Sequence, residues 1–145
     1  MRRILTAMVV ALSLGATVAP SLVSAEPIQN LAPADRYFGR MKMSILGIRN
    51  SIKDLEVRLD RAPEDADHVF DKAVLVEDAL HDWQVKFPRD PWIPRYAYQL
   101  AQLYGKVARD DARERMNDTL DWLEATYPES EFAFLPRETA QVQLP

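Results

Sequence analysis

The residues that could act as bases, nucleophiles or metal ligands are few and widely spaced in this chain of 145 residues. His68 and His81 are the two histidines, and their separation of 13 positions differs from the i, i+4 spacing of a helical zinc site. Cysteine is absent, which excludes thiolate catalysis and cysteine-ligated metals. Carboxylate pairs such as Asp65 with Asp67 lie at predicted helix starts, where acidic side chains complement the helix dipole. The sequence therefore predicts no catalytic, cofactor-binding or metal-binding residue, and a protein that is not an enzyme.

Methionine offers an alternative chemistry. Met41 and Met43, together with the two histidines, could supply soft ligands to periplasmic copper. On a helix, side chains two positions apart point about 200 degrees apart, so one helix cannot bring both thioethers to one ion. We therefore interpret these methionines as core-filling side chains and keep a periplasmic metal-binding protein as the less favoured alternative.

A mixed polar and aromatic stripe on the third predicted helix is the main candidate for partner binding. The stripe consists of Arg95, Tyr98, Gln102 and Lys106. A cation, a ring and an amide on one face suit an acidic or C-terminal peptide segment, and an ordinary solvated face is the alternative. Trp122 lies beside the apolar stripe of the fourth helix, so we expect it to be half exposed and a further contact candidate.

Four helices are expected to position these residues, because apolar side chains recur three or four residues apart almost without interruption. The first stripe comprises Phe38, Met41, Ile45, Ile48, Ile52, Leu55 and Leu59, which predicts a long first helix. Further stripes predict helices over residues 69–87, 92–107 and 112–127, with prolines in the connections. We predict an all-α fold of antiparallel helical hairpins, arranged as a stack or as a closed bundle. The helical domain spans residues 34–128, between a polar lead (26–33) and an irregular tail (129–145).

The first helix could instead be an interface between two chains. Its heptad-like stripe, which includes Ile45, Ile48 and Ile52, could close a coiled coil rather than pack on the other helices. This alternative predicts a homodimer through the first helix and a homo-oligomeric structural protein.

The first 25 residues have the pattern of a cleaved secretion signal. Arg2 and Arg3 give a basic start, an apolar run follows, and Val23 and Ala25 place small residues at a cleavage site after Ala25. Losing both arginines changes the formal net charge from −4 to −6, which disfavours nucleic acid and anionic lipid as partners. We therefore expect a periplasmic or secreted protein with no stable membrane insertion after cleavage.

One segment of the sequence recurs after 40 residues. Asp78, Leu80, Phe87, Pro88 and Trp92 return as Asp118, Leu120, Tyr127, Pro128 and Phe132. Residues 126–133 and 86–92 resemble the repeat junction of tetratricopeptide-type modules in bacterial envelope proteins, and Leu100-Ala101 with Tyr104 is similar to the first-helix signature of such a repeat. This resemblance implies a TPR-like stack of hairpins that binds another envelope protein or peptide segment, or that helps to assemble the envelope.

Overall fold

The computed structural model describes residues 32–135 and 137, and the regular elements within them are helical. In chain order they are η2 (Pro33–Asp35), α1 (Ile45–Arg61), η3 (Pro63–Asp65), α2 (Ala66–Lys86), α3 (Trp92–Lys106), α4 (Asp110–Thr126) and η4 (Glu131–Phe134). The predicted all-α fold is confirmed. The predicted secretion signal, most of the lead and the end of the tail lie outside the described residues. None of the helices in residues 32–135 combines the length and the apolar character needed to cross a lipid bilayer.

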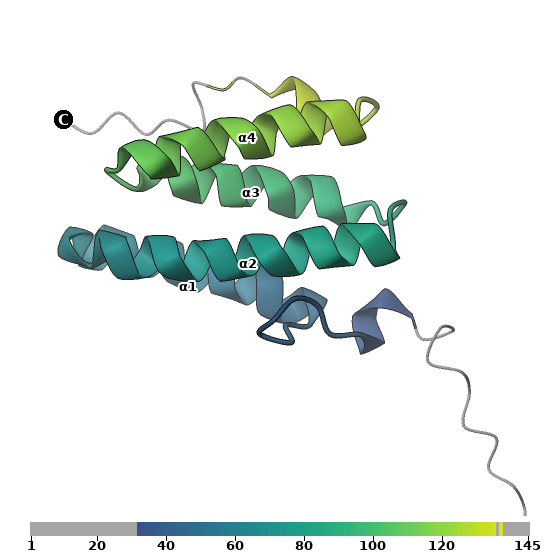
Figure 1. The fold of residues 1–145 in the computed structure, drawn as a ribbon, viewed down its shortest axis with the longest axis horizontal. Helices are drawn as coiled ribbons and strands as arrows, with labels where there is room; N and C mark the ends of the chain where they lie inside the picture. Colours follow the sequence, from purple (N-terminus) through teal and green to yellow (C-terminus); the bar gives the residue numbers. More distant parts are fainter. Residues whose placement is uncertain (1–31, 136, 138–145) are drawn as a thin grey trace, which may run out of the picture.

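Two antiparallel hairpins, α1 with α2 and α3 with α4, lie against each other (Figure 1). The helix α3 is central, since it packs on α1, α2 and α4 and also contacts η4. Nearly every side of α3 is therefore buried, from Ile93 at its start to Tyr104 near its end. The largest fully buried side chains of the whole core are Trp83, Tyr104 and Phe38. Burial of these large apolar side chains is the main source of stability in a domain without disulfides.

Three of the helices end in one repeated turn. The C-cap residues are Ala62, Phe87 and Tyr127, and each is followed by proline. Their φ angles are −141, −137 and −129 degrees, because the ring of a following proline disfavours the helical conformation. In each turn, the backbone N–H of the residue three positions after the C-cap donates to the carbonyl of the C-cap residue, at 2.9 to 3.0 Å. The 40-residue echo thus has a structural counterpart, and the end of α1 adds a third copy.

The predicted start of the first helix is wrong, since α1 begins at Ile45 rather than near Phe38. Residues 38–43 form a tight turn in which Phe38 and Met43 exchange two backbone hydrogen bonds of 2.8 and 2.9 Å. Ser44 then caps α1, its Oγ accepting the Gly47 N–H at 3.0 Å. The apolar spacing of Phe38 and Met41 is accidental: the first is fully buried and the second is 53% exposed.

The turn at residues 38–43 packs closely on α2, and Gly39 makes this close packing possible. Gly39 has φ +66 degrees, and a Cβ there would lie 2.7 Å from the Cα of Ala79. This close approach lets the Gly39 N–H donate to Asp82 Oδ2 and the Arg40 N–H donate to Asp78 Oδ2, both at 2.8 Å. The turn also delivers the Phe38 ring into the core. η2 and the start of α1 are thereby held beside the end of α2.

Candidate functional site

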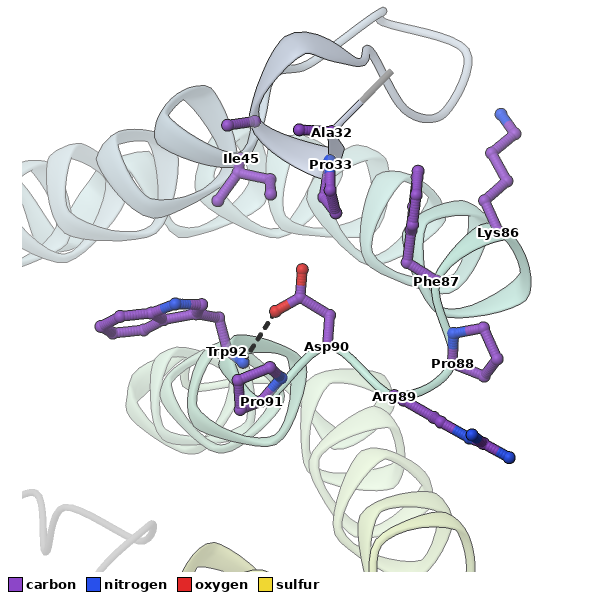
Figure 2. Close-up of a pocket in the computed structure, with 11 residues that line it drawn as sticks. Ala32, Pro33, Ile45, Lys86, Phe87, Pro88, Arg89, Asp90, Pro91 and Trp92 are labelled. Atoms are coloured by element: carbon purple, nitrogen blue, oxygen red, sulfur yellow. Dashed lines mark hydrogen bonds between the residues drawn. The ribbon is translucent and has the colours of Figure 1, made fainter. Parts of the chain in front are cut away.

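An apolar groove of about 730 Å³ opens beside the turn that joins α2 to α3. Figure 2 shows its walls, which come from η2, from the first residue of α1 and from the α2–α3 turn. The apolar lining side chains include Pro33, Ile45, Phe87, Pro88, Pro91 and Trp92. A concave apolar surface of this volume is typical of sites that receive a ligand or a partner's side chains.

Asp90 fixes the turn that forms one side of the groove. Its Oδ2 accepts the Trp83 indole N–H at 3.2 Å. Its Oδ1 accepts the Trp92 backbone N–H at 3.1 Å, the bond drawn as a dashed line in Figure 2. Since Trp83 is fully buried, the first bond ties the turn to the core. The second bond satisfies an N–H at the start of α3. As a result, Phe87 and Trp92 are held on opposite sides of the groove.

Arginine side chains stack on both aromatic walls. The Arg95 guanidinium lies 5.6 Å from the ring centroid of Trp92, and the Arg36 guanidinium lies 5.7 Å from that of Phe87. Trp92 is 50% exposed, so a large aromatic surface remains open to solvent at the rim. A guanidinium over a ring uses its face, so the N–H edge of Arg95 can still form hydrogen bonds with a partner. The groove therefore combines apolar walls with cationic donors at its rim.

Of the predicted partner-binding stripe, Arg95 lies over Trp92, which lines the groove, and Tyr98 is buried. Tyr98 is 6% exposed, and its ring lies 6.2 Å from that of Phe132 in η4. Its assignment as an exposed contact residue is therefore corrected. The physical reason is that α3 is enclosed by helices on nearly all sides, so a position beside the core stripe is also buried.

The other members of the stripe lie farther along α3. Gln102 is partly buried, and Lys106 at the last turn has its Nζ 3.4 Å from Glu56 Oε1 and 4.0 Å from Asp60 Oδ1. Lys106 thus connects α3 to α1 by ion pairs. The structure does not gather the four predicted residues into one exposed surface.

Trp122 is partly buried, as expected, but it lies away from the groove. Its ring is 4.6 Å from that of His81 on α2 and 5.9 Å from that of Tyr127, both in edge-on geometry. Much of the Trp122 indole is therefore in contact with other side chains of the chain. His81 in turn joins a polar cluster rather than standing alone.

This cluster is centred on Glu77 and joins α2, α3 and α4. Glu77 Oε2 accepts the Tyr104 hydroxyl and the Arg115 guanidinium, both at 2.7 Å, while His81 Nε2 lies 3.8 Å from Oε1. Burial raises the pKa of Glu77, but the nearby His81, the hydrogen bond from Tyr104 and the charge and hydrogen bond of Arg115 outweigh it, so the pKa is lowered below its ordinary value of 4.5. The arrangement keeps Glu77 ionised and cross-links three helices, which is a structural role.

A second cleft, of about 420 Å³, lies between the α2–α3 turn and the turn after α4. Tyr127 lines it, and within residues 32–135 the buried Tyr127 hydroxyl has no hydrogen-bond partner. Burial, reinforced by the charge of Asp90, raises the pKa of Tyr127 to about 12. The phenol is therefore neutral at ordinary pH, and its hydroxyl is a local weak point of the fold.

The two methionines considered as metal ligands line one small pocket. Met41 and Met43 both face a cavity of about 200 Å³ between the 38–43 turn, α1 and α2, with Asp54 and Lys72 at its edge. The argument that a helix would separate their side chains is therefore wrong, because these residues form a turn. His68 and His81 are not among the residues that line this pocket. Within residues 32–135, no three His, Asp or Glu side chains gather as a metal site would require.

Sequence reasoning missed the groove itself. Periodicity assigns residues to helix faces, whereas the groove forms where a turn, η2 and the start of α1 meet. The available signal was the segment from Phe87 to Trp92, in which two aromatic residues flank two prolines. Aromatic residues in an irregular, proline-rich turn are less easily buried than those on a helix, so they merit attention as contact residues.

In comparisons with known proteins, no family model, no curated protein and no solved structure matches this chain.

Proposed function

We propose that this chain is a non-enzymatic protein-binding or assembly module of the bacterial cell envelope, exported to the periplasm or secreted. It acts by holding a peptide segment of a partner protein in the groove beside the α2–α3 turn. The observation that carries this proposal is Trp92, a half-exposed indole at the rim of an apolar groove of about 730 Å³. Tryptophan is enriched among the residues that dominate binding energy at protein interfaces.

The helix arrangement supports the same proposal. In a stack of hairpins, each hairpin buries one stripe and leaves a concave surface for a partner. Here the first residue of α1 and the first residue of α3, Ile45 and Trp92, line the same groove. The proposed export rests on the sequence of residues 1–25, and the proposed envelope role rests on the resemblance of the helix junctions to tetratricopeptide-type modules.

Selection of displayed random peptides on the exported chain tests this function. Peptides enriched on the unmodified chain are expected to bind the Trp92→Ala variant at least about tenfold more weakly, because the indole forms one wall of the groove. Phe134→Ala is the matched control, since Phe134 is 77% exposed on η4, away from the groove lining. Circular dichroism and thermal melting verify that both variants fold.

Two outcomes would refute the proposed function. One is that no peptide is enriched above an unrelated immobilised protein. The other is that the enriched peptides bind Trp92→Ala as tightly as the unmodified chain, which would place binding elsewhere.

A further inference from the structure

Basic residues lie both in the lining of the groove and over its aromatic walls. The arginines Arg36 and Arg95 lie over its aromatic walls, and Lys86 and Arg89 belong to its lining. Asp90 is the single acidic residue of the lining, and both of its carboxylate oxygens already accept N–H donors from the chain. With Lys86 paired to Asp82, the cations available to a partner here are Arg89 and Arg95.

Two of these cations have no charged partner within the described part of the chain. Lys86 is paired, with its Nζ 2.6 Å from Asp82 Oδ2. In contrast, no side-chain hydrogen bond or ion pair joins Arg89 or Arg95 to another residue among 32–135, and both side chains are exposed. Arg95 is positioned by stacking on Trp92, and Figure 2 shows Arg89 extending outward from the turn.

This local basic character is opposite to that of the whole chain, whose formal net charge is −4. Other arginines, such as Arg109 and Arg115, bind carboxylates of the chain itself at 2.6 to 2.7 Å. Charges separated by more than about 8 Å are largely screened at physiological ionic strength. A bound segment therefore interacts mainly with the charges at the groove itself, which are Arg89, Arg95, Asp90 and the Lys86–Asp82 pair.

We infer that the segment bound in this groove is acidic, with an apolar or aromatic side chain inserted between Phe87 and Trp92 and Asp or Glu residues on either side of it. The carboxylates pair with the N–H edges of Arg95 and Arg89, a planar geometry that permits two parallel hydrogen bonds. This inference rests on the proposed function and adds the chemistry of the partner. The apolar walls supply affinity, and the arginines select the sign of the flanking charge.

The test uses the peptides selected on the exported chain. Their sequences are expected to be rich in Asp and Glu around one large apolar residue. Their binding should weaken by about tenfold or more when NaCl is raised from about 0.05 to 0.5 M.

The double variant Arg89→Glu with Arg95→Glu should lose at least about tenfold in affinity for these peptides. Arg49→Glu with Arg61→Glu is the control, because these two arginines of α1 are exposed and outside the groove lining.

The possible failures are distinguishable. If the enriched peptides depend on Trp92 but are neutral or basic, the proposed function stands and the acidic partner is overturned. Equal loss of binding in the Arg89/Arg95 and Arg49/Arg61 variants would show a nonspecific charge effect and would also overturn it. If a basic peptide binds more tightly to the Arg89→Glu/Arg95→Glu variant than to the unmodified chain, these two positions select the charge of the bound segment, as inferred. Absence of any Trp92-dependent peptide instead refutes the proposed function itself.

Discussion

At the scale of single residues, polar groups inside this domain differ sharply in how well they are satisfied. Glu77 has three partners, whereas the buried hydroxyl of Tyr127 has no hydrogen-bond partner among the described residues. In an interior of low polarity, a satisfied polar group stabilises the fold and an unsatisfied one opposes it. Substitutions at these two positions should therefore have opposite effects.

Tyr127→Phe is expected to raise the free energy of unfolding by about 1 kcal/mol, because it removes a buried hydroxyl that lacks a partner. It should also alter the response to alkali. Because burial raises the folded-state pKa of Tyr127 from 10.0 to about 12, the folded chain resists ionising this phenol, so the unmodified chain should lose stability as pH rises from 10 toward 12 and the variant should lose less. Urea unfolding at neutral and alkaline pH measures both effects. A clear loss of stability at pH 7 would contradict the absence of a partner.

Glu77→Gln is expected to lower the free energy of unfolding by about 1 to 3 kcal/mol at neutral pH, because it weakens the bonds to Tyr104 and Arg115. The folded-state pKa of Glu77 lies below 4.5, so its stabilisation is present above that pH and is lost as pH falls through the folded value. The variant should therefore lose less stability on acidification than the unmodified chain. Glu64→Gln, at an exposed position in η3, is the control and should change little. An unchanged acid response in Glu77→Gln would contradict this account.

Residue type and spacing predicted part of the candidate site. Arg95 belongs to the predicted stripe of cation, ring and amide side chains off the core face, and its guanidinium lies 5.6 Å from the ring of Trp92, so its role in partner binding stays a prediction. Tyr98 was misassigned, since one helix's periodicity cannot show how many neighbours enclose it. The role of Asp90 in holding Trp83 depends on a contact between the α2 core and the following turn, which a single sequence does not display.

At the scale of elements, the helix ends were the most predictable feature. Proline after Phe87 and after Tyr127 forces the preceding residue out of helical geometry, so α2 and α4 end within one residue of the predicted positions. The start of α1 was not predicted correctly, because Phe38 and Met41 imitate helical spacing by chance. Gly39 was visible in the sequence, but its positive φ and its contact with α2 become evident only in three dimensions.

Gly39→Ala should destabilise the domain by about 1 to 3 kcal/mol. The new Cβ would lie 2.7 Å from the Cα of Ala79. The alanine would also have to keep the backbone angle φ of +66 degrees, which is unfavourable for L-residues. Gly47→Ala is the matched control within the first turn of α1, where alanine favours the helix and meets Ser44 Oγ at 3.3 Å. The control should change stability by less than about 1 kcal/mol in thermal or urea unfolding. Equal effects of the two substitutions would contradict the proposed importance of the 38–43 turn.

At the scale of the whole molecule, the sequence identified the all-α class and the hairpins but not the groove between them. Each hairpin follows from local signals, namely apolar periodicity and proline-terminated helices. The groove depends on how the first hairpin lies on the second, with Ile45 and Pro33 brought to the α2–α3 turn. That placement is set by packing over the entire core, including the ring of Phe38 against Trp83 at 5.7 Å.

The proposed export belongs to the same scale and can be tested separately from binding. We expect the exported form to begin at Glu26, as measured by intact mass after expression in a bacterium. Ala25→Leu should block processing, because signal peptidase requires a small residue there, while Ala16→Leu within the apolar run should leave processing intact. Processing of the Ala25→Leu variant at the same bond would rule out the proposed cleavage site.

The repeated turn after Ala62, Phe87 and Tyr127 makes the molecule modular. Since α2 and α4 end in the same backbone geometry, a duplicate of residues 88–127 spliced in after Tyr127 would meet a compatible junction at both of its ends. The added hairpin would bring its own copies of Trp92 and Arg95, and η4 would still terminate the array. The backbone of both joints would thus be reused, while the added helices would need apolar faces that match the outer surface of α4.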